Sequence, residues 1–278
     1  MYSLVREFLP RIHPTLGNRF GIEIEMEGPS LPLVPDSRWR NVFDGSLRGN
    51  NTEYVLEEPL NSTECAEQIQ KLVETLKNSG SIAPSDRCGI HIHVNVQNLR
   101  LNQLYNMLML YFIVESLLID EFSPERKGNL FCLDVIEAEG LIDIICQKMR
   151  CRPSAILERD ERNTLKYAAL NIEALQKFGT LEFRAISTPP NPDELQSVIR
   201  IIRLFSRIKA RARQYTYPIN IIEDFSRMGP IDFFAKNYPM LNQKHGDLEE
   251  RLFSSMRLVQ EIAYGFPVKR SESSSPAL

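Results

Sequence analysis

The sequence lacks a strong charge imbalance and a long uninterrupted hydrophobic run. Its 33 lysines and arginines against 36 aspartates and glutamates give a formal net charge of -3. Such a balance gives the chain no overall attraction to nucleic acid or to an anionic membrane. The most apolar run, residues 104–119, contains Asn106 and Glu115 and falls short of a membrane-spanning helix. The composition therefore indicates neither a membrane nor a nucleic-acid partner.

Paired cysteine motifs and the common nucleotide-binding motifs are also missing. The 5 cysteines are an odd number without CxxC spacing, which indicates reduced thiols and no zinc framework. The first residues are mixed and charged early, unlike a secretory signal peptide, so we expect a cytoplasmic protein. No GxxxxGK[ST] loop, dinucleotide fingerprint or HExxH motif occurs. A bound nucleotide would therefore be held mainly by metal ions and scattered basic groups.

The most informative stretch that is present is FGIEIEME, at residues 20–27. Alternation along a strand places its glutamates (Glu23, Glu25 and Glu27) on one face and its aliphatic residues on the other. Carboxylates two residues apart lie roughly 7 Å apart and repel by about 2 kcal/mol at an effective dielectric of about 20. Basic side chains or metal ions should offset this repulsion, and oxygen ligands favour magnesium, manganese or calcium. The alternative is an ordinary half-solvated strand with a glutamate-rich outer face.

The same alternation recurs in two later stretches, GIHIHVNV at residues 89–96 and GTLEFRAI at residues 179–186. Their polar faces carry His91, His93 and Asn95 in the first and Glu182 and Arg184 in the second. In an antiparallel sheet, one face can pack on a core while the other lines a wet space. If the three polar faces coincide, they form a basin that suits phosphoryl chemistry. Carboxylates would hold divalent metal ions there, and arginine would stabilise charge on the transferred group.

Helical patterns separate these strands. A helix capped near Asn61 should end at Gly80, and further helices are expected over residues 101–122, 134–149 and 195–215. The many basic residues of the last helix are expected to form a solvated face, and the charge-dense residues 152–162 an exposed loop or helix end. The pair Asp44-Gly45 marks the turn of a hairpin. Polar-faced strands alternating with covering helices predict an α+β fold with a mostly antiparallel sheet.

Several motifs together resemble those of the amidoligase family, which is related to glutamine synthetase and glutamate–cysteine ligase. They are GIEIE, WRNVFDGSL followed by Glu53, CGIHIHVNV, and YAALNIEALQKFGTLEFRA, in the order that the family has them. The resemblance runs from about residue 19 to about residue 213. It implies a curved antiparallel sheet that forms a funnel, with helices on its outer face, as in glutamine synthetase. We accordingly expect a catalytic domain at residues 1–215, a helical extension at 216–266 and a disordered tail at 267–278.

The resemblance also implies the reaction, which is ATP-dependent formation of an amide bond through an acyl-phosphate. Magnesium or manganese ions would lie between ATP and the acid. The substrates would be a small-molecule or peptide carboxylate and an amine, and nothing in the sequence identifies either one. Some relatives form rings, so an oligomer is compatible with the family.

Carried onto this sequence, the family pattern assigns roles to individual residues. The metal ligands would be Glu23, Glu25, Glu53, Glu182 and one histidine of the pair His91 and His93, with the other orienting it or touching phosphate. Arg184 would contact the γ-phosphate or acyl-phosphate. Asp44 and Ser46 would face the substrates, and Asp44 would deprotonate or position the amine. Arg126, Tyr167 and Asn171 match family motifs and are assigned to cofactor binding.

Each assignment has a structural alternative. Glu182 and Arg184 could form a simple ion pair, and Asp44 could make an Asx-type turn. Arg126 reads more readily as an exposed loop charge, and Cys88 as a small buried residue. At the level of function, the alternatives are another metal-dependent phosphoryl-transfer or hydrolase enzyme using the same basin, or a binding protein that kept the fold and lost turnover.

Overall fold

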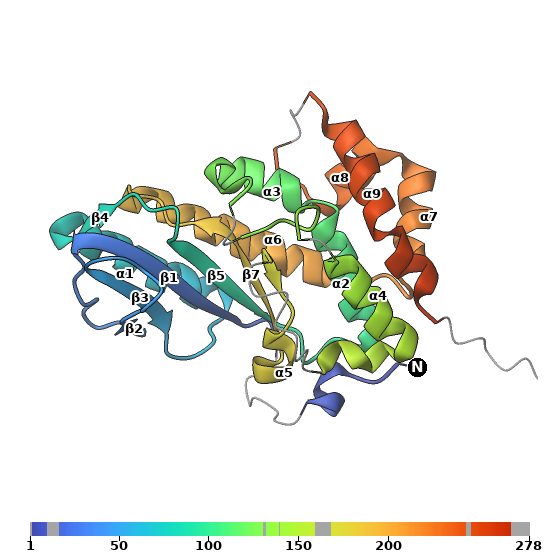
Figure 1. The fold of residues 1–278 in the computed structure, drawn as a ribbon, viewed down its shortest axis with the longest axis horizontal. Coiled ribbons are helices and arrows are strands. Elements are labelled where there is room, and N and C mark those ends of the chain that lie inside the picture. The colour runs from blue at the N-terminus through green and yellow to red at the C-terminus, as the bar shows by residue number, and fades with distance from the viewer. Residues whose placement is uncertain are drawn as a thin grey trace, which may run out of the picture.

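The computed structural model describes residues 2–9, 17–129, 132–138, 140–158, 168–242 and 246–267. Its strands are β1 (Phe20–Ser30), β2 (Trp39–Val42), β3 (Asn51–Leu56), β4 (Ser81–Ala83), β5 (Gly89–Asn95), β6 (Leu170–Asn171) and β7 (Thr180–Ser187). They form one open antiparallel sheet in the order β2-β3-β1-β5-β7-β6, with β4 also paired to β1 (Figure 1). The predicted α+β class and antiparallel sheet are confirmed, as is the hairpin, which β2 and β3 form.

Helices complete the fold. They are α1 (Ser62–Ser79), α2 (Leu101–Phe112), α3 (Glu115–Phe122), α4 (Leu141–Cys151), α5 (Ala174–Phe178), α6 (Ser197–Ala212), α7 (Ile219–Met228), α8 (Pro230–Asn237) and α9 (Leu248–Gly265). Short 3-10 turns are η1 (Val5–Phe8), η2 (Pro124–Arg126), η3 (Pro153–Leu157) and η4 (Pro192–Gln196). Helices α1 and α6 lie behind the sheet in Figure 1. None of the helices in the described ranges is both long enough and apolar enough to cross a membrane.

The apolar face of the sheet forms the core that positions the polar face. Ile22 and Ile24 of β1 and Ile90 and Ile92 of β5 are fully buried or nearly so. Burial of one such side chain contributes about 1.5–3 kcal/mol relative to exposure. Phe183 of β7 stacks on Phe205 of α6 with ring centroids 4.0 Å apart. These contacts fix which way each strand faces, so the alternating polar residues must all point to the opposite side.

Helix α1 begins and ends where the sequence predicts. The Asn61 side chain accepts hydrogen bonds from the amides of Thr63 and Glu64, and the Glu64 carboxylate accepts one from the Asn61 amide. This reciprocal capping satisfies amides that have no partner within the helix. At the other end, the Gly80 amide donates to the Leu76 carbonyl.

Two helix predictions are wrong in their bounds. The helix expected over 101–122 is broken at Val114, where φ is -119° and ψ is 1°, so α2 and α3 are separate. The helix expected over 134–149 begins only at Leu141, because Gly140 adopts a left-handed conformation with φ of 84°. Residues 153–157 of the predicted exposed segment form η3, whose Ala155, Ile156 and Leu157 are buried. Residues 159–162 of that segment lie outside the described ranges.

The prediction that the basic residues of α6 are solvated is wrong for two of them. Lys209 and Arg211 are buried, because α6 packs against α1, α2 and α8. The Lys209 ammonium donates to the carbonyls of Asn95 and Gly17, at 2.5 and 3.1 Å. Burial lowers the pKa of Lys209 to about 7, with a contribution from Arg213. Arg211 Nε donates to the Asn237 side chain at 2.7 Å.

Helices α7, α8 and α9 confirm the predicted helical character of the C-terminal region and gather at one end of the molecule (Figure 1). Helix α9 packs on α2 and α4, and its Arg251 pairs with Asp120 of α3 at 2.5 Å. The division into a catalytic domain and an extension stays a prediction. The predicted tail lies, from residue 268 onward, outside the described ranges.

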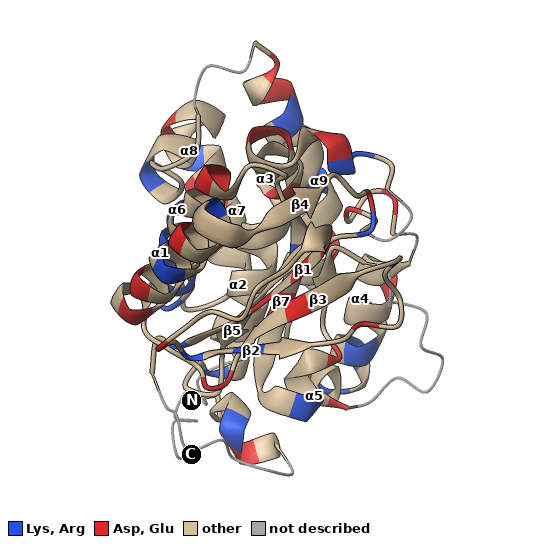
Figure 2. Ribbon diagram, turned by 90° about the vertical axis from the view of Figure 1, so that its left-hand side faces the viewer, with Lys and Arg blue, Asp and Glu red and all other residues tan. Residues whose placement is uncertain are grey.

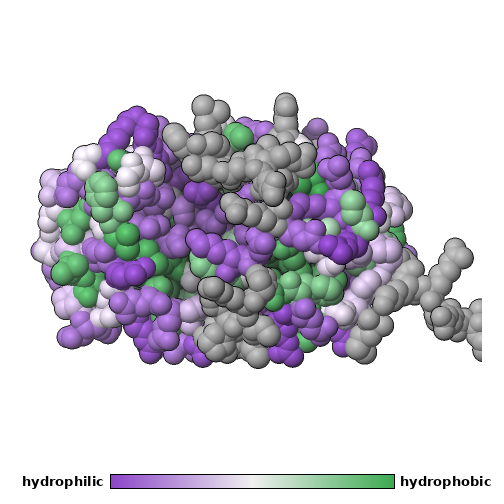
Figure 3. All heavy atoms as spheres, turned by 60° about the horizontal axis from the view of Figure 1, so that its bottom comes forward, coloured by the Kyte–Doolittle hydropathy of each residue, from purple (hydrophilic) through white to green (hydrophobic). Residues whose placement is uncertain are grey.

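The surface is mixed in character. On the side at the bottom of Figure 1, which Figure 3 turns toward the viewer, hydrophobic surface occurs in separate areas among hydrophilic residues. Leu33 and Phe43, in the loops that flank β2, are each 73% exposed. Scattered apolar side chains are ordinary on folded proteins. They therefore do not define an interaction surface.

Candidate active site

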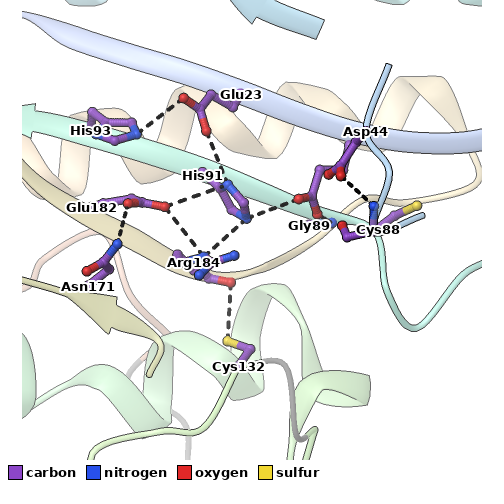
Figure 4. A network of polar contacts seen from close by, with 12 residues as sticks. Glu23, Asp44, Cys88, Gly89, His91, His93, Cys132, Asn171, Glu182 and Arg184 are labelled. Carbon is purple, nitrogen blue, oxygen red and sulfur yellow. Dashed lines mark hydrogen bonds and ion pairs between the residues drawn. The ribbon is translucent and has the colours of Figure 1, made fainter. Parts of the chain in front are cut away.

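The strand register brings the three predicted polar faces together. Glu23 lies opposite His91, Glu25 opposite Glu53, and His93 opposite Glu182. Residues directly opposite in an antiparallel pair share a face of the sheet. Acidic positions accordingly lie within the sheet in Figure 2, and the labelled side chains converge in Figure 4. The predicted metal ligands, both histidines and Arg184 thus occupy one continuous face.

His91 is the most connected residue of this face. Its Nδ1 lies 3.3 Å from Glu23 Oε2 and 3.7 Å from Glu182 Oε1. Its Nε2 lies 3.7 Å from Glu25 Oε1 and accepts a hydrogen bond of 3.3 Å from Arg184 Nε (Figure 4). Burial disfavours the charged imidazole, but the Glu23 hydrogen bond and the Glu25 charge outweigh burial and raise the pKa of His91.

His93 extends the cluster toward the start of β1. Its Nε2 lies 3.5 Å from Glu23 Oε1, so Glu23 lies between the two imidazoles (Figure 4). Its Nδ1 lies 3.0 Å from the Thr180 hydroxyl, and its ring meets that of Phe178 edge-on. Thr180 and Phe178 were missed at the sequence level. Alternation along GTLEFRAI already places Thr180 on the face of Glu182 and Arg184, whereas nothing in the sequence marks Phe178.

The carboxylates of the cluster differ in their ionisation. Burial opposes ionisation of Glu23, but its hydrogen bonds to His91 and His93 prevail and hold its pKa well below the usual range. Burial raises the pKa of Glu25 despite the opposing charge of His91. Burial, together with the negative charges of Glu23 and Glu25, raises the pKa of Glu53 to about 7. The cluster thus holds more carboxylates than its positive charges can balance, and a bound cation would offset the repulsion between them.

Two sets of side chains have geometry that could hold a metal ion. Glu23, Glu53 and His91 form one, and Glu23, His93 and Glu182 form the other. Within each set, one ligand atom per residue lies within 4.8 Å of the others. Carboxylate oxygens with an imidazole suit a hard or borderline divalent cation. Each histidine belongs to one set, so the geometry gives both of them a possible ligand role. Glu25 belongs to neither set and accepts a hydrogen bond of 2.8 Å from the Gly89 amide.

The ion pair between Glu182 and Arg184 exists, at 3.4 Å, but it is part of the cluster rather than isolated. Asn171 of β6 also reaches this point, where its Nδ2 donates to Glu182 Oε2 at 2.7 Å. Its Oδ1 accepts from the Glu173 amide at 2.9 Å, which fixes the orientation of the side-chain amide. Tyr167, the neighbouring predicted residue, lies outside the described ranges.

Asp44 and Ser46 lie at the rim, in the loop between β2 and β3. Asp44 Oδ1 accepts from the Ser46 amide at 2.8 Å, which is the Asx-type turn of the structural alternative. The Asp44 charge still contributes to raising the pKa values of Glu25 and Glu53. Ser46 is exposed. Glu27 accepts from the Arg48 amide at 2.7 Å, which gives it a structural role in the same loop.

The expectation that Arg126 is an exposed loop charge is wrong. Arg126 is only 4% exposed, because η2 directs it inward, and its Nη2 donates to the Cys88 carbonyl. Cys88 is buried, as expected, and burial raises its pKa to about 11.

A cavity of about 360 Å³ adjoins the cluster at the start of β1. Glu23, His93 and Thr180 contribute to its lining, and Arg19 and Arg40 supply positive charge. Its apolar walls include Val55, Leu56, Pro59 and Phe178. A larger hollow of about 780 Å³ lies beside α9, but none of the predicted site residues lines it. Size alone therefore does not locate the site, whereas the convergence of ionisable groups does.

The sequence model of a family described as "putative amidoligase enzyme" matches residues 38–203, more than half of the chain. The chain therefore belongs to this family. The match covers β2 through the first part of α6, whereas β1, with its GIEIE motif, lies ahead of it. No curated protein matches the chain.

Proposed function

We propose that this protein is an ATP-dependent carboxylate–amine ligase that forms an amide bond through an acyl-phosphate. The observation that carries the proposal is the convergence of Glu23, Glu53, Glu182, both histidines and Arg184 on one face of the sheet. Membership of the amidoligase family supports the ligase class. The funnel shape that the resemblance implies is part of the same proposal.

Divalent cations, Mg²⁺ or Mn²⁺, fit the donor sets of the site. Glu23, Glu53 and His91 would hold one, and Glu23, His93 and Glu182 another. Glu25 lies on the same face, with its Oε1 3.7 Å from His91 Nε2, and would serve as a further ligand. Bound there, the ions supply neutralisation of phosphate charge and alignment of the reacting groups.

In the first step, a carboxylate oxygen of the acid attacks the γ-phosphorus of ATP. The bond from that phosphorus to the β–γ bridging oxygen breaks, and ADP leaves. Arg184 stabilises the charge on the transferred group; its Nε lies beside His91 and Glu182, at the centre of the basin. Asn171 acts as a positioning residue, since it holds Glu182.

In the second step, the amine attacks the acyl carbon, and the bond from that carbon to the phosphate oxygen breaks. Phosphate leaves, and the amine nitrogen gives up one proton. Asp44, at the rim, is our candidate to take that proton or to position the amine, with Ser46 beside it. A carboxylate is a poor electrophile, and phosphorylation supplies the leaving group that it lacks.

The cavity beside Glu23 and His93 supports a location for the nucleoside part of ATP. Its apolar walls suit a planar base, while Arg19 and Arg40 suit negatively charged groups. A triphosphate extending inward from this cavity would reach the two donor sets.

The test is ADP formation by the purified chain with MgCl₂, ATP and a panel of acids and amines. We expect ADP only when a matching acid and amine are both present. ADP formation with ATP alone would instead indicate a hydrolase using the same basin. Glu182→Ala and Arg184→Ala should each abolish ADP formation while leaving the folded state intact by circular dichroism. Full activity in either variant would contradict the assigned roles.

A further inference from the structure

A polar hollow of about 490 Å³ lies where the end of α6 meets α7 and α8. Its lining includes three cationic side chains, Arg211 of α6, Arg227 of α7 and Lys236 of α8, and two acids, Glu223 and Asp224. All five follow residue 203, where the match to the amidoligase family ends. Helices α7 and α8 lie at the end of the molecule away from β2 and β3 (Figure 1), and none of the residues assigned to the candidate active site lines this hollow. The hollow is therefore separate from that site.

Arg211 contributes a buried charge that has only neutral partners. It is 9% exposed, and its Nε donates to the Asn237 side-chain oxygen at 2.7 Å and its Nη1 to that of Gln214. Tyr215 also contacts it, through its hydroxyl and through its ring, whose centroid lies 5.6 Å from the guanidinium carbon. Within the described ranges, no carboxylate forms an ion pair with Arg211. Burying a charge is costly unless it is paired, so an anion in the hollow would supply the charge that Arg211 lacks.

The other two cations share a single carboxylate. Asp224 Oδ2 accepts hydrogen bonds from Lys236 Nζ at 2.7 Å and from the Tyr215 hydroxyl at 3.0 Å, and Asp224 Oδ1 pairs with Arg227. Burial opposes ionisation of Asp224, but the hydrogen bonds from Lys236, Tyr215 and Arg227 prevail and lower its pKa. Asp224 therefore carries one negative charge beside three cations. Positive charge stays in excess even when Glu223, which is exposed, is counted.

We infer that this hollow binds the phosphate group of a small polar ligand, independently of the proposed ligase function. A guanidinium presents N–H donors in the fork geometry that matches phosphate oxygens, and Lys236 adds a mobile point charge. The hollow is larger than one phosphate group and falls within the size range of small-molecule sites, so it has room for a phosphate ester as well as for the free ion. The cations come from three different helices, so a bound phosphate would also link α6, α7 and α8.

The test is calorimetric titration of the full chain with glucose 6-phosphate, inorganic phosphate and glucose. EDTA is present throughout, so that no metal ion holds phosphate in the active site. We expect both phosphate compounds to bind and glucose not to bind. Tighter binding of glucose 6-phosphate would identify an ester as the ligand, whereas equal binding would identify the free ion.

Variants then locate the bound phosphate. Arg211→Gln should weaken its binding about 10- to 100-fold. Arg213→Gln is the matched control, because it removes the same charge from an exposed residue two positions further along that does not line the hollow, and it should keep the wild-type affinity. If Arg211→Gln does not fold, Arg227→Gln, at a surface ion pair, should still weaken binding about threefold.

Three results would overturn the inference. The first is that the wild type binds neither phosphate compound up to about 10 mM. The second is unchanged affinity in folded Arg211→Gln or in Arg227→Gln, or a loss in Arg213→Gln equal to that in Arg211→Gln. The third is loss of binding in Arg184→Ala with retention in Arg211→Gln, which would place the phosphate in the active site. None of these results bears on ADP formation, so the ligase proposal stands or falls separately.

Discussion

Replacing Glu115 with glutamine should stabilise the protein increasingly as pH rises. Glu115 is 1% exposed at the start of α3. Its Oε2 accepts a hydrogen bond of 2.5 Å from the Val135 amide, and the Tyr111 hydroxyl also interacts with the carboxyl. Burial raises the pKa of this carboxyl to about 8, against the Val135 hydrogen bond, which lowers it. Glutamine has the same shape and can accept the same hydrogen bond without carrying a charge.

The sign and size of the effect follow from proton binding. The folded chain keeps the Glu115 proton up to about pH 8, whereas the unfolded chain releases it near the ordinary value of 4.5. Between these values the unfolded state binds fewer protons, so the free energy of unfolding falls as pH rises. The loss is at most about 1.4 kcal/mol per pH unit and amounts to about 3 kcal/mol at pH 7. The glutamine variant does not incur this loss.

Urea unfolding of both proteins from pH 5 to pH 8 measures the effect. The stability of Glu115→Gln minus that of wild type should rise by about 2–3 kcal/mol between pH 5 and pH 7. Taking the difference cancels other groups, including Lys209, whose pKa of about 7 makes stability rise with pH above that value. Glu261→Gln, at an exposed carboxylate, is the control and should show a flat difference. A flat difference for Glu115→Gln would refute the argument.

Three further predictions concern the site. MgCl₂ with the non-hydrolysable ATP analogue AMP-PCP should raise the melting temperature of wild type and of the control Glu27→Gln, but not that of Glu23→Gln, because Glu23 belongs to both donor sets. An equal rise in all three proteins would count against metal binding at these sets. Gly89→Ala should lower the free energy of unfolding, measured with urea, by about 1–3 kcal/mol, because the new Cβ would meet Arg126 and Glu25. Gly45→Ala, whose Cβ meets nothing within 4 Å, should leave that free energy nearly unchanged. Thr180→Val should lower the rate of ADP formation without unfolding the chain, because it removes the hydroxyl that orients His93. An unchanged rate would show that this hydroxyl does not contribute to the reaction.

The site was predictable from sequence where a local rule decides the outcome. The alternation in β1, β5 and β7 fixes which side chains share a face, because once the aliphatic side chains are buried on one face, the polar ones must lie on the other. It also predicts Thr180, which shares the parity of Glu182. The register that places Glu23 opposite His91 depends on how distant strands pair, and no local rule in the sequence determines it.

The two basic residues that were wrongly predicted to be exposed, Arg126 and Lys209, are buried for a common reason, which is contact with segments distant in the sequence. Arg126 is a polar residue in a polar loop, and only the packing of η2 beside β7 brings it over Gly89. Lys209 has the helical spacing of a solvated face, yet it is covered because the carbonyls of Gly17 and Asn95 lie within its reach. In both cases the side chain is buried by segments far away in the chain. Amphipathic periodicity describes only the helix that carries the residue.

The two faces of β1 explain why this sheet can carry so many acids. On one face, Ile22, Ile24 and Met26 are buried against helices, and they contribute the free energy that holds the strand in register. On the other, the raised pKa values of Glu25 and Glu53 show that the carboxylates are destabilised in their charged forms. The fold therefore maintains a concentration of negative charge that its own imidazoles and guanidiniums only partly balance. A site of this kind gains stability from any cation that neutralises it, so metal binding, nucleotide binding and fold stability should be linked in this protein.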